Sequence, residues 1–474
     1  MGDRAKLLIA VLALAIAHLI ASAPPIGGLS QKGMAMLGIA FLALVYWSTE
    51  CVPIPVTGLV VMLLTTLYGV FPISKSVSFI ASKVNVLFIA GLVLSVALAT
   101  YKLDKLLGLK ILSLVGERTD MIVLGMMLST AFISMWMSNT AAAALMAPVA
   151  AGILSMLNAK QGESNLGKAL MIGIAYAATI GGIGTPVGTP PVPITMGNIE
   201  SSLKIRISFV QWMAWGVPVV LILTLIAWRI LLLLYPPEQV ATGVSREAIK
   251  RELESLGPLT PEQKRALALM ATAVALWLVE PLARLLLSSQ PWAPDWTYVV
   301  SLVVIILSFV PGVGVLKARQ INEIDWGVVL LIAGGLALGE GLRETGVLKL
   351  LAESIKGPLQ AYPPSLVIVI IAAISALSIT VICSITATTA TMVPFAISVA
   401  TALGLDPKTS AVAAVAAGLA SCYAFLLPAN TPPNAIAYSY GYFKSHEMAR
   451  AGALLMVAGI ALLVVITPLV SLLI

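Results

Sequence analysis

The chain has 474 residues, of which 59% are hydrophobic and only 10% are charged, and its net charge at neutral pH is +7. Soluble domains carry about 25% charged residues, so this composition excludes soluble globular and disordered proteins and indicates an integral membrane protein. The basic residues are scattered over short loops, which is typical of topology signals rather than of a nucleic-acid-binding face.

Apolar stretches of about 20 residues, the length that crosses a bilayer, recur along the chain. The first, from Leu7 to Ser22, resembles a signal peptide, but it ends in a poor cleavage site and further spans follow. We therefore expect it to be the first transmembrane helix. About eleven spans are expected, at 6–23, 33–50, 54–71, 84–101, 168–199, 209–235, 263–288, 297–316, 326–347, 408–441 and 448–474.

Two further stretches, 121–157 and 366–402, are long and apolar but carry polar residues at their centres. Each arm beside the centre has about 17 residues and would rise about 25 Å as a helix, short of the roughly 30 Å hydrocarbon core. We therefore expect two re-entrant helical hairpins with tips near mid-membrane, where irregular backbone must face protein or a wet cavity. The alternative is two long, kinked transmembrane helices.

Matched motifs in one order indicate an internal repeat. Ser138-Asn139-Thr140 and Thr189-Pro190-Pro191 correspond to Ser384-Ile385-Thr386 and Thr431-Pro432-Pro433. Each copy holds five spans and one hairpin, and an odd number of spans turns the second copy upside down, as in secondary transporters. The expected divisions are 1–32 for the first helix and its connection, 33–235 for the first repeat (hairpin 121–157, broken helix 168–199), 236–262 for the inter-repeat loop, and 263–474 for the second repeat (hairpin 366–402, broken helix 408–441).

Lys and Arg indicate the orientation. When each hairpin enters and leaves on one side, more of these residues lie on the side of the N-terminus. This bias predicts a protein of the cell (inner or plasma) membrane with a cytoplasmic N-terminus and an external C-terminus.

The hairpin tips and broken helices are expected to meet and form a binding site. Asn139 offers amide donors and an acceptor, and Thr140 and Thr386 offer hydroxyls. Such donors, with the N–H groups of helix N-termini, suit a carboxylate or another small anion, while unwound carbonyls suit an alkali cation. Because charged side chains are almost lacking there, the anion needs co-bound cations, and the lack of Asp and Glu disfavours proton coupling.

These motifs, together with Trp47-x-x-Glu50-x-x-Pro53, resemble the divalent anion/sodium symporter family over nearly the whole chain. The resemblance implies a homodimer in which a scaffold holds a moving transport domain, an elevator mechanism, and sodium as the coupling ion without other cofactors. Substrates of the family are succinate, malate, fumarate, citrate and, in some members, sulfate. We expect a sodium-coupled transporter of C4-dicarboxylates.

Site residues follow from the resemblance by position. One sodium site would use Ser134, Ser138, Asn139 and Gly188, and the second would use Thr380, Cys383, Ile385 and Asn430. The substrate would contact Asn139, Thr140, Thr386, Thr189, Pro190, Thr431 and Pro432.

Two positions depart from the family pattern. Ile385 stands where the family has Asn, and Val192 follows the first Thr-Pro-Pro where Asn is usual. Ile385 removes an amide from the second cation site and from one substrate carboxylate, which Asn430 or the Thr388–Thr389 pair could replace. The departure leaves open a reduced sodium stoichiometry, a monoanion with an apolar end, or sodium-independent exchange.

Other classes are weighed against this interpretation. A sodium-independent anion exchanger on the same fold and a transporter of sulfate or another small anion remain alternatives. A passive channel would need a continuous polar pore or charged rings, which the sequence lacks. An enzyme is not expected, because the spans hold no catalytic constellation, and Cys51, Cys383 and Cys422 lack metal-ligand spacing.

Overall fold

The computed structural model describes residues 2–114, 118–238, 250 and 252–474, and the regular structure within them is helical. Part of the expected inter-repeat loop, 239–249 and 251, lies outside the described residues. The first half contains α1 (Asp3–Ser22), α2 (Gln31–Thr49), α3 (Ile54–Leu67), α4 (Ile73–Ser78), α5 (Lys83–Thr100), α6 (Leu103–Leu114), α7 (Thr119–Ser134), α8 (Asn139–Met156), α9 (Asn165–Gly182), α10 (Pro191–Leu203) and α11 (Phe209–Leu234). The second half contains α13 (Pro261–Leu278), α14 (Glu280–Leu286), η1 (Ala293–Asp295), α15 (Trp296–Phe309), η2 (Ala318–Glu323), α16 (Trp326–Glu344), α17 (Val347–Leu359), α18 (Pro364–Ile382), α19 (Ile385–Ala402), α20 (Pro407–Ala420), η3 (Pro428–Asn430), α21 (Pro432–Ser439) and α22 (Ser445–Leu473).

The prediction of an all-helical protein with many membrane spans is confirmed. Among the described residues, nine helices are long and apolar enough to cross a bilayer, or up to ten when the bent pair α13–α14 counts as one span. Two expected spans, 54–71 and 297–316, form helices of 14 residues, and 168–199 and 408–441 are interrupted. The hairpin arms α8, α18 and α19 do reach the length of a span. Length alone therefore does not separate crossing helices from hairpin arms.

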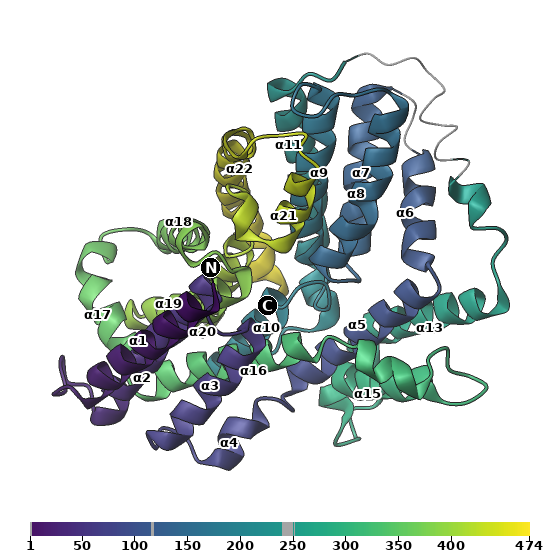
Figure 1. The fold of residues 1–474 in the computed structure, drawn as a ribbon. Helices are drawn as coiled ribbons and strands as arrows, with labels where there is room; N and C mark the ends of the chain where they lie inside the picture. Colours follow the sequence, from purple (N-terminus) through teal and green to yellow (C-terminus); the bar gives the residue numbers. More distant parts are fainter. Residues whose placement is uncertain (1, 115–117, 239–249, 251) are drawn as a thin grey trace.

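Most of the helices, all but α6 and α17 among those described, fall into two groups that are each drawn from both halves of the chain. In the hairpin group (α7–α11 and α18–α22), α7 packs on α9, α11 on α22, and both α18 and α19 on α20. In the frame group (α1–α5 and α13–α16), α1 packs on α2, α3 on α16, and α5 on α15. Figure 1 shows α7, α8 and α9 standing beside one another, with α5, α13 and α15 below them. The site described below lies in the hairpin group.

Both stretches expected as hairpins form helix pairs that turn at a serine. Ser138 Oγ accepts a hydrogen bond from the N–H of Ala141 at 3.2 Å, and Ser384 Oγ accepts one from the N–H of Ala387 at 3.3 Å. A serine in this position satisfies an N–H group at the start of the next helix, so it starts α8 and α19 at matching points. Before the second turn, Cys383 adopts a left-handed backbone conformation with φ +53°.

Small residues bring the helices of each group into close contact. A Cβ at Gly181 of α9 would lie 2.3 Å from the carbonyl oxygen of Ala131 in α7. A Cβ at Gly58 of α3 would lie 2.4 Å from the carbonyl oxygen of Leu330 in α16. Membrane helices gain dispersion energy from such close backbone contact, because burial of apolar surface drives association little in lipid. Gly181 thereby fixes the distance between the first hairpin and the broken helix α9–α10.

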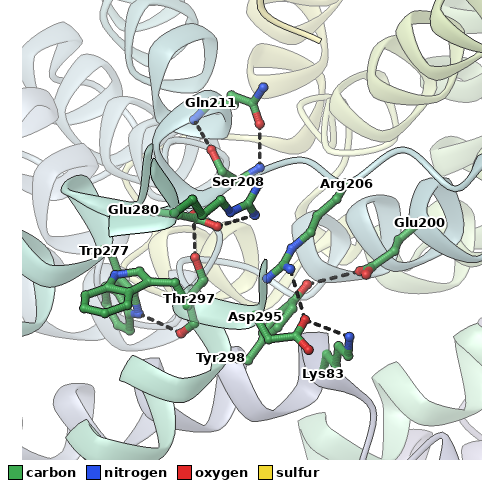
Figure 2. A network of polar contacts seen from close by, with 12 residues as sticks. Lys83, Glu200, Arg206, Ser208, Gln211, Trp277, Glu280, Asp295, Thr297 and Tyr298 are labelled. Carbon is green, nitrogen blue, oxygen red and sulfur yellow. Dashed lines mark hydrogen bonds and ion pairs between the residues drawn. The ribbon is translucent and has the colours of Figure 1, made fainter. Parts of the chain in front are cut away.

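A polar network joins the loop between α10 and α11 to the frame group (Figure 2). Asp295 Oδ1 lies 3.0 Å from Arg206 Nη1 and 2.7 Å from Lys83 Nζ. The hydroxyl of Tyr298 donates to Glu200 Oε2 at 3.1 Å, and the Arg206 guanidinium lies 4.6 Å from the centre of the Tyr298 ring. These contacts hold one arrangement of the hairpin group against the frame group.

Candidate substrate and cation site

Each hairpin packs on the broken helix of the other repeat. α8 of the first hairpin contacts α21 of the second repeat, and α19 of the second hairpin contacts α10 of the first. The residues predicted to bind substrate therefore lie around the junction of the two repeats. Asn139, Thr189, Thr386 and Thr431 are buried, Pro190 is half-buried, and Thr140 and Pro432 are exposed.

Side-chain and backbone polar groups converge at the first tip. The hydroxyl oxygen of Ser134 lies 2.9 Å from Asn139 Oδ1 and 2.6 Å from the carbonyl oxygen of Ala178 in α9. The hydroxyl of Thr185, in the break between α9 and α10, donates to the carbonyl of Met135. The tip of the first hairpin is thus tied both to α9 and to the break that follows it.

Three oxygens surround the glycines of the first break. A Cβ at Gly188 would lie 2.5 Å from the carbonyl oxygen of Gly182 and 2.9 Å from that of Ser134, and a Cβ at Gly182 would lie 2.2 Å from Asn139 Oδ1. Ser134 and Gly182 end α7 and α9, and the last carbonyls of a helix have no partner within it. Such carbonyls with an amide oxygen fit a bare alkali cation. Three of the four predicted residues contribute here, whereas Ser138 is exposed and caps α8.

The second tip also turns at a capping serine, but its connection between the helices is shorter and its side chains differ. The alignment that pairs Thr189 with Thr431 places Asn430 opposite Gly188. Asn430 Nδ2 lies 3.2 Å from the carbonyl oxygen of Ile379 and 3.7 Å from Cys383 Sγ. Its Oδ1 accepts a hydrogen bond from the N–H of Leu427 at 2.8 Å. Since the N–H of Leu427 faces Oδ1 and the carbonyl of Ile379 faces Nδ2, these two partners define the orientation of the amide.

Three threonine hydroxyls near the second tip donate to backbone carbonyls three or four residues earlier in the chain. Thr380 Oγ1 donates to the carbonyl of Leu377 at 2.7 Å. Thr388 and Thr389 donate to the carbonyls of Ser384 and Ile385 at 2.9 Å and 2.8 Å. Ile385 itself is half-buried and packs against the large apolar core. These hydroxyls can still accept hydrogen bonds, but their protons are committed within the helices.

Asn434 is a second buried amide in the break between α20 and α21. Its Nδ2 lies 2.8 Å from the carbonyl oxygen of Ala424 and 2.9 Å from that of Leu427. Two buried atoms beside it, Asn434 Oδ1 and Thr431 Oγ1, have no hydrogen-bond partner within the described residues. Buried polar atoms normally have partners, so these two are candidates for contact with a ligand.

Electrostatics at this junction come from the backbone. None of the predicted substrate or cation residues carries a charge. α8, α10, α19 and α21 all begin within or next to the paired motifs, so four helix N-termini start there. The N-terminus of a helix carries about half a positive charge and free N–H groups, which favour an anion. The site can therefore bind an anion through amides, hydroxyls and helix ends.

Sequence reasoning did not identify the carbonyl of Gly182 or the amide of Asn434 as parts of this site. The run Gly181-Gly182-Ile183-Gly184 ends a membrane helix before a Thr-Pro-Pro motif, and that position is a usable signal for exposed carbonyls. Asn434 is visible only as the difference from Val192 when the repeats are aligned.

The chain is similar to known proteins along nearly its whole length. The family model described as the sodium:sulfate symporter transmembrane region covers residues 4–473. The sodium-dependent dicarboxylate transporter SdcS of Staphylococcus saprophyticus is 31% identical over 438 residues, which is 90% of this chain and 83% of the relative. The SdcS protein of Staphylococcus aureus strain USA300 is 32% identical over 442 residues, with the same shares covered.

A solved structure shows a similar fold. The crystal structure of the Alcanivorax borkumensis YdaH transporter, described as having an unusual topology, matches with a TM-score of 0.58 over 98% of both chains. At 14% identity this likeness concerns the fold alone. The family model and the SdcS relatives carry the assignment: the chain belongs to the sodium:sulfate symporter family and is a multi-pass membrane transporter rather than an enzyme.

Proposed function

We propose that this protein is a sodium-coupled secondary active transporter of small dianions, with C4-dicarboxylates such as succinate as the preferred substrates. The observation that carries the proposal is the oxygen cage formed by the carbonyls of Ser134 and Gly182 with Asn139 Oδ1. The cage lies beside the substrate residues, and this position gives a physical reason for coupling anion transport to sodium. A dianion among neutral side chains leaves uncompensated charge, which a cation in the adjacent cage reduces.

Transport would proceed by an elevator movement. The hairpin group holds every predicted substrate and cation residue, and its contacts with the frame group include the polar network around Asp295. Movement of the hairpin group as a unit would carry the bound anion and cation across the membrane without dismantling their site. We extend the proposal to a homodimer in the cell membrane, with the N-terminus in the cytoplasm and the C-terminus outside.

The test is uptake of labelled succinate into proteoliposomes. One condition has an inward sodium gradient, the second has potassium in its place, and the third has unlabelled succinate inside without sodium. Uptake that requires the sodium gradient would support symport. Uptake that requires only internal succinate would overturn symport in favour of exchange, the candidate that the apolar Ile385 favours. Sulfate competition would show whether the site accepts an inorganic dianion.

A variant of Asn139 links this activity to the site. Asn139→Ala removes the oxygen that accepts from Ser134 and one side of the cage, so we expect sodium-driven uptake to fall at least about tenfold. Ser155→Ala is the matched control, because Ser155 is an exposed residue farther along the same helix. Wild-type uptake by Asn139→Ala, at equal protein levels in the membrane, would exclude this site.

A further inference from the structure

The buried backbone carbonyls near the two breaks have different neighbours in the two repeats. In the first repeat, the carbonyls of Ser134 and Gly182 face a glycine, Gly188, which has no side chain to fill the space between them. In the second repeat, the position opposite Gly188 holds Asn430, whose amide nitrogen lies 3.2 Å from the carbonyl oxygen of Ile379. The second repeat therefore has a polar side chain at the position where the first repeat has a glycine packed against two carbonyls.

A second asparagine, Asn434, also distinguishes the break of the second repeat from that of the first. The alignment that pairs Gly188 with Asn430 also pairs Gly182 with Ala424 and Val192 with Asn434. The carbonyl of Ala424 accepts from the amide of Asn434 at 2.8 Å, whereas Val192, the residue opposite Asn434, has no amide to donate to the carbonyl of Gly182. The carbonyl opposite that of Gly182 is thus hydrogen-bonded to a side-chain amide in the second repeat, and Asn430 contacts the carbonyl of Ile379, one residue before the position opposite Ser134.

At the hairpin tips the difference between the repeats is reversed, because the first tip has an amide side chain and the second does not. The first tip carries Asn139, whose oxygen lies in the cage, and the second tip carries Ile385, which packs against the apolar core. The first repeat has its amide on the hairpin and small or apolar residues in the break. The second repeat has its amides in the break and an apolar residue on the hairpin.

We propose that the Asn430 side-chain amide takes the place of a second coupling cation, so that the protein moves one sodium ion with each dicarboxylate. The inference rests on the proposed sodium-coupled function and specifies its stoichiometry. An amide N–H group is the positive end of a dipole, and in the second repeat the amides of Asn430 and Asn434 direct such groups at the carbonyl oxygens of Ile379, which also accepts from the N–H of Cys383, and of Ala424. The Asn430 Oδ1 accepts a hydrogen bond from the N–H of Leu427. Rotation of the amide by half a turn would place Nδ2 against that N–H group and Oδ1 against the carbonyl oxygen of Ile379, so both contacts would become unfavourable.

Charge movement distinguishes one coupled cation from more. Inward movement of a dicarboxylate dianion with one sodium ion carries one negative charge inward, so a membrane potential that is positive inside accelerates it. Two sodium ions make the cycle electroneutral, and three reverse the effect of the potential. The experiment uses labelled succinate, well above its carboxyl pKa values, in proteoliposomes with potassium–valinomycin potentials of either sign.

For the wild-type protein we expect a sodium dependence with a Hill coefficient of about 1 and faster uptake when the interior is positive. For Asn430→Asp, which replaces the amide by an oxygen ligand of the same shape, we expect a Hill coefficient of about 2 and loss of the response to potential. Asn158→Asp is the matched control, since it adds the same charge at an exposed position after α8 and should behave as wild type.

A wild-type Hill coefficient of about 2 with no response to potential, or acceleration by a negative interior, would overturn the inference and leave the proposed function standing. If sodium stimulates no uptake at all, the proposed function fails and the inference fails with it. The two failures are therefore distinct.

Alkylation of Cys383 gives a second measurement that does not require transport. Its thiol lies 3.7 Å from Asn430 Nδ2 and is half-buried, while Cys422 is fully buried. In Cys51→Ser, Gly188→Ala protein, in which the first cage is blocked, we expect sodium to leave the alkylation rate of Cys383 unchanged. Protection of Cys383 by sodium in that protein would place a cation at the second tip and overturn the inference.

Discussion

The two hairpins share the capping serine at the turn and differ in their connections and surroundings. Both turn at a capping serine, and each second arm contains a proline, Pro148 or Pro394. The first arm α7 is mostly buried against α9, whereas α18 exposes Leu377 and Val381 just before its tip. The comparison shows that an internal repeat can keep its helix caps and prolines while the side chains near its backbone carbonyls diverge, and those side chains decide which partners the carbonyls can have.

The largest effect is expected from filling the first cage. In Gly188→Ala the new Cβ would lie 2.5 Å from the carbonyl oxygen of Gly182, closer than real Cβ atoms approach, so the cage must distort. We expect the sodium concentration for half-maximal uptake to rise about tenfold or more, which corresponds to at least about 1.4 kcal/mol of cation binding. Sodium titration of succinate uptake measures this change.

Gly152→Ala is the matched control for that substitution. Gly152 lies in α8, which packs on the broken helix that contains Gly188, and a Cβ at Gly152 would meet no atom within 4 Å. The change should leave sodium affinity unaltered and raise helix propensity by roughly 1 kcal/mol. Equal sodium affinities in the two alanine variants would show that Gly188 does not face the cation, and the contrast between the repeats would lose its basis.

A smaller effect is expected from making the second tip resemble the first. Ile385→Asn restores an amide opposite Asn139, within a half-buried position at the start of α19. One added hydrogen bond to a substrate carboxylate is worth about 1 kcal/mol, so we expect the KM for succinate to fall roughly fivefold. The Hill coefficient for sodium should stay unchanged, because Asn430 still contacts the carbonyl of Ile379.

A double variant that combines Ile385→Asn with Asn430→Asp tests both differences between the two repeats together. If both features of the second repeat act at one site, the double variant should show tighter succinate binding together with steeper sodium dependence. No change of KM in Ile385→Asn would mean that position 385 faces away from the substrate. Measurement of KM for succinate and for a monocarboxylate of equal length separates a gain at one carboxylate from a general change in uptake.

The sequence predicted the architecture because the signals for membrane helices are strong and additive. Long apolar runs, the paired Ser-x-Thr centres and the Thr-Pro-Pro motifs mark helices, tips and breaks without any tertiary information. The number of membrane spans was harder to predict from the sequence, because α8, α18 and α19 are long and apolar enough to resemble crossing helices. Whether a helix crosses or turns back depends on its neighbours, which composition does not record.

The site was predictable at the level of motifs and less so at the level of contacts. Residues such as Asn139 and Gly188 stand out in the sequence, and the structure brings them together. The hydrogen bond from Asn430 to Ile379 depends on where the carbonyls of α18 point, and a backbone carbonyl has no signature in a sequence. The polar network around Asp295 joins three distant segments, so no local pattern indicates it.

The smallest effect is expected at that network, which lies away from both tips. The pair of Arg206 with Asp295, at 3.0 Å and only partly buried, joins the hairpin group to the frame group and must break if the groups move relative to one another. Partly exposed ion pairs contribute about 1 kcal/mol or less, so Arg206→Ala and Asp295→Ala should each change the maximal uptake rate by no more than about fivefold. If the pair acts as one contact, the double variant should match the single variants instead of multiplying their effects. The sodium Hill coefficient should be the same in all four proteins of this cycle. Purely multiplicative changes in rate would show that the pair is not a coupled contact, and a changed Hill coefficient would mean that cation coupling is not confined to the hairpin tips.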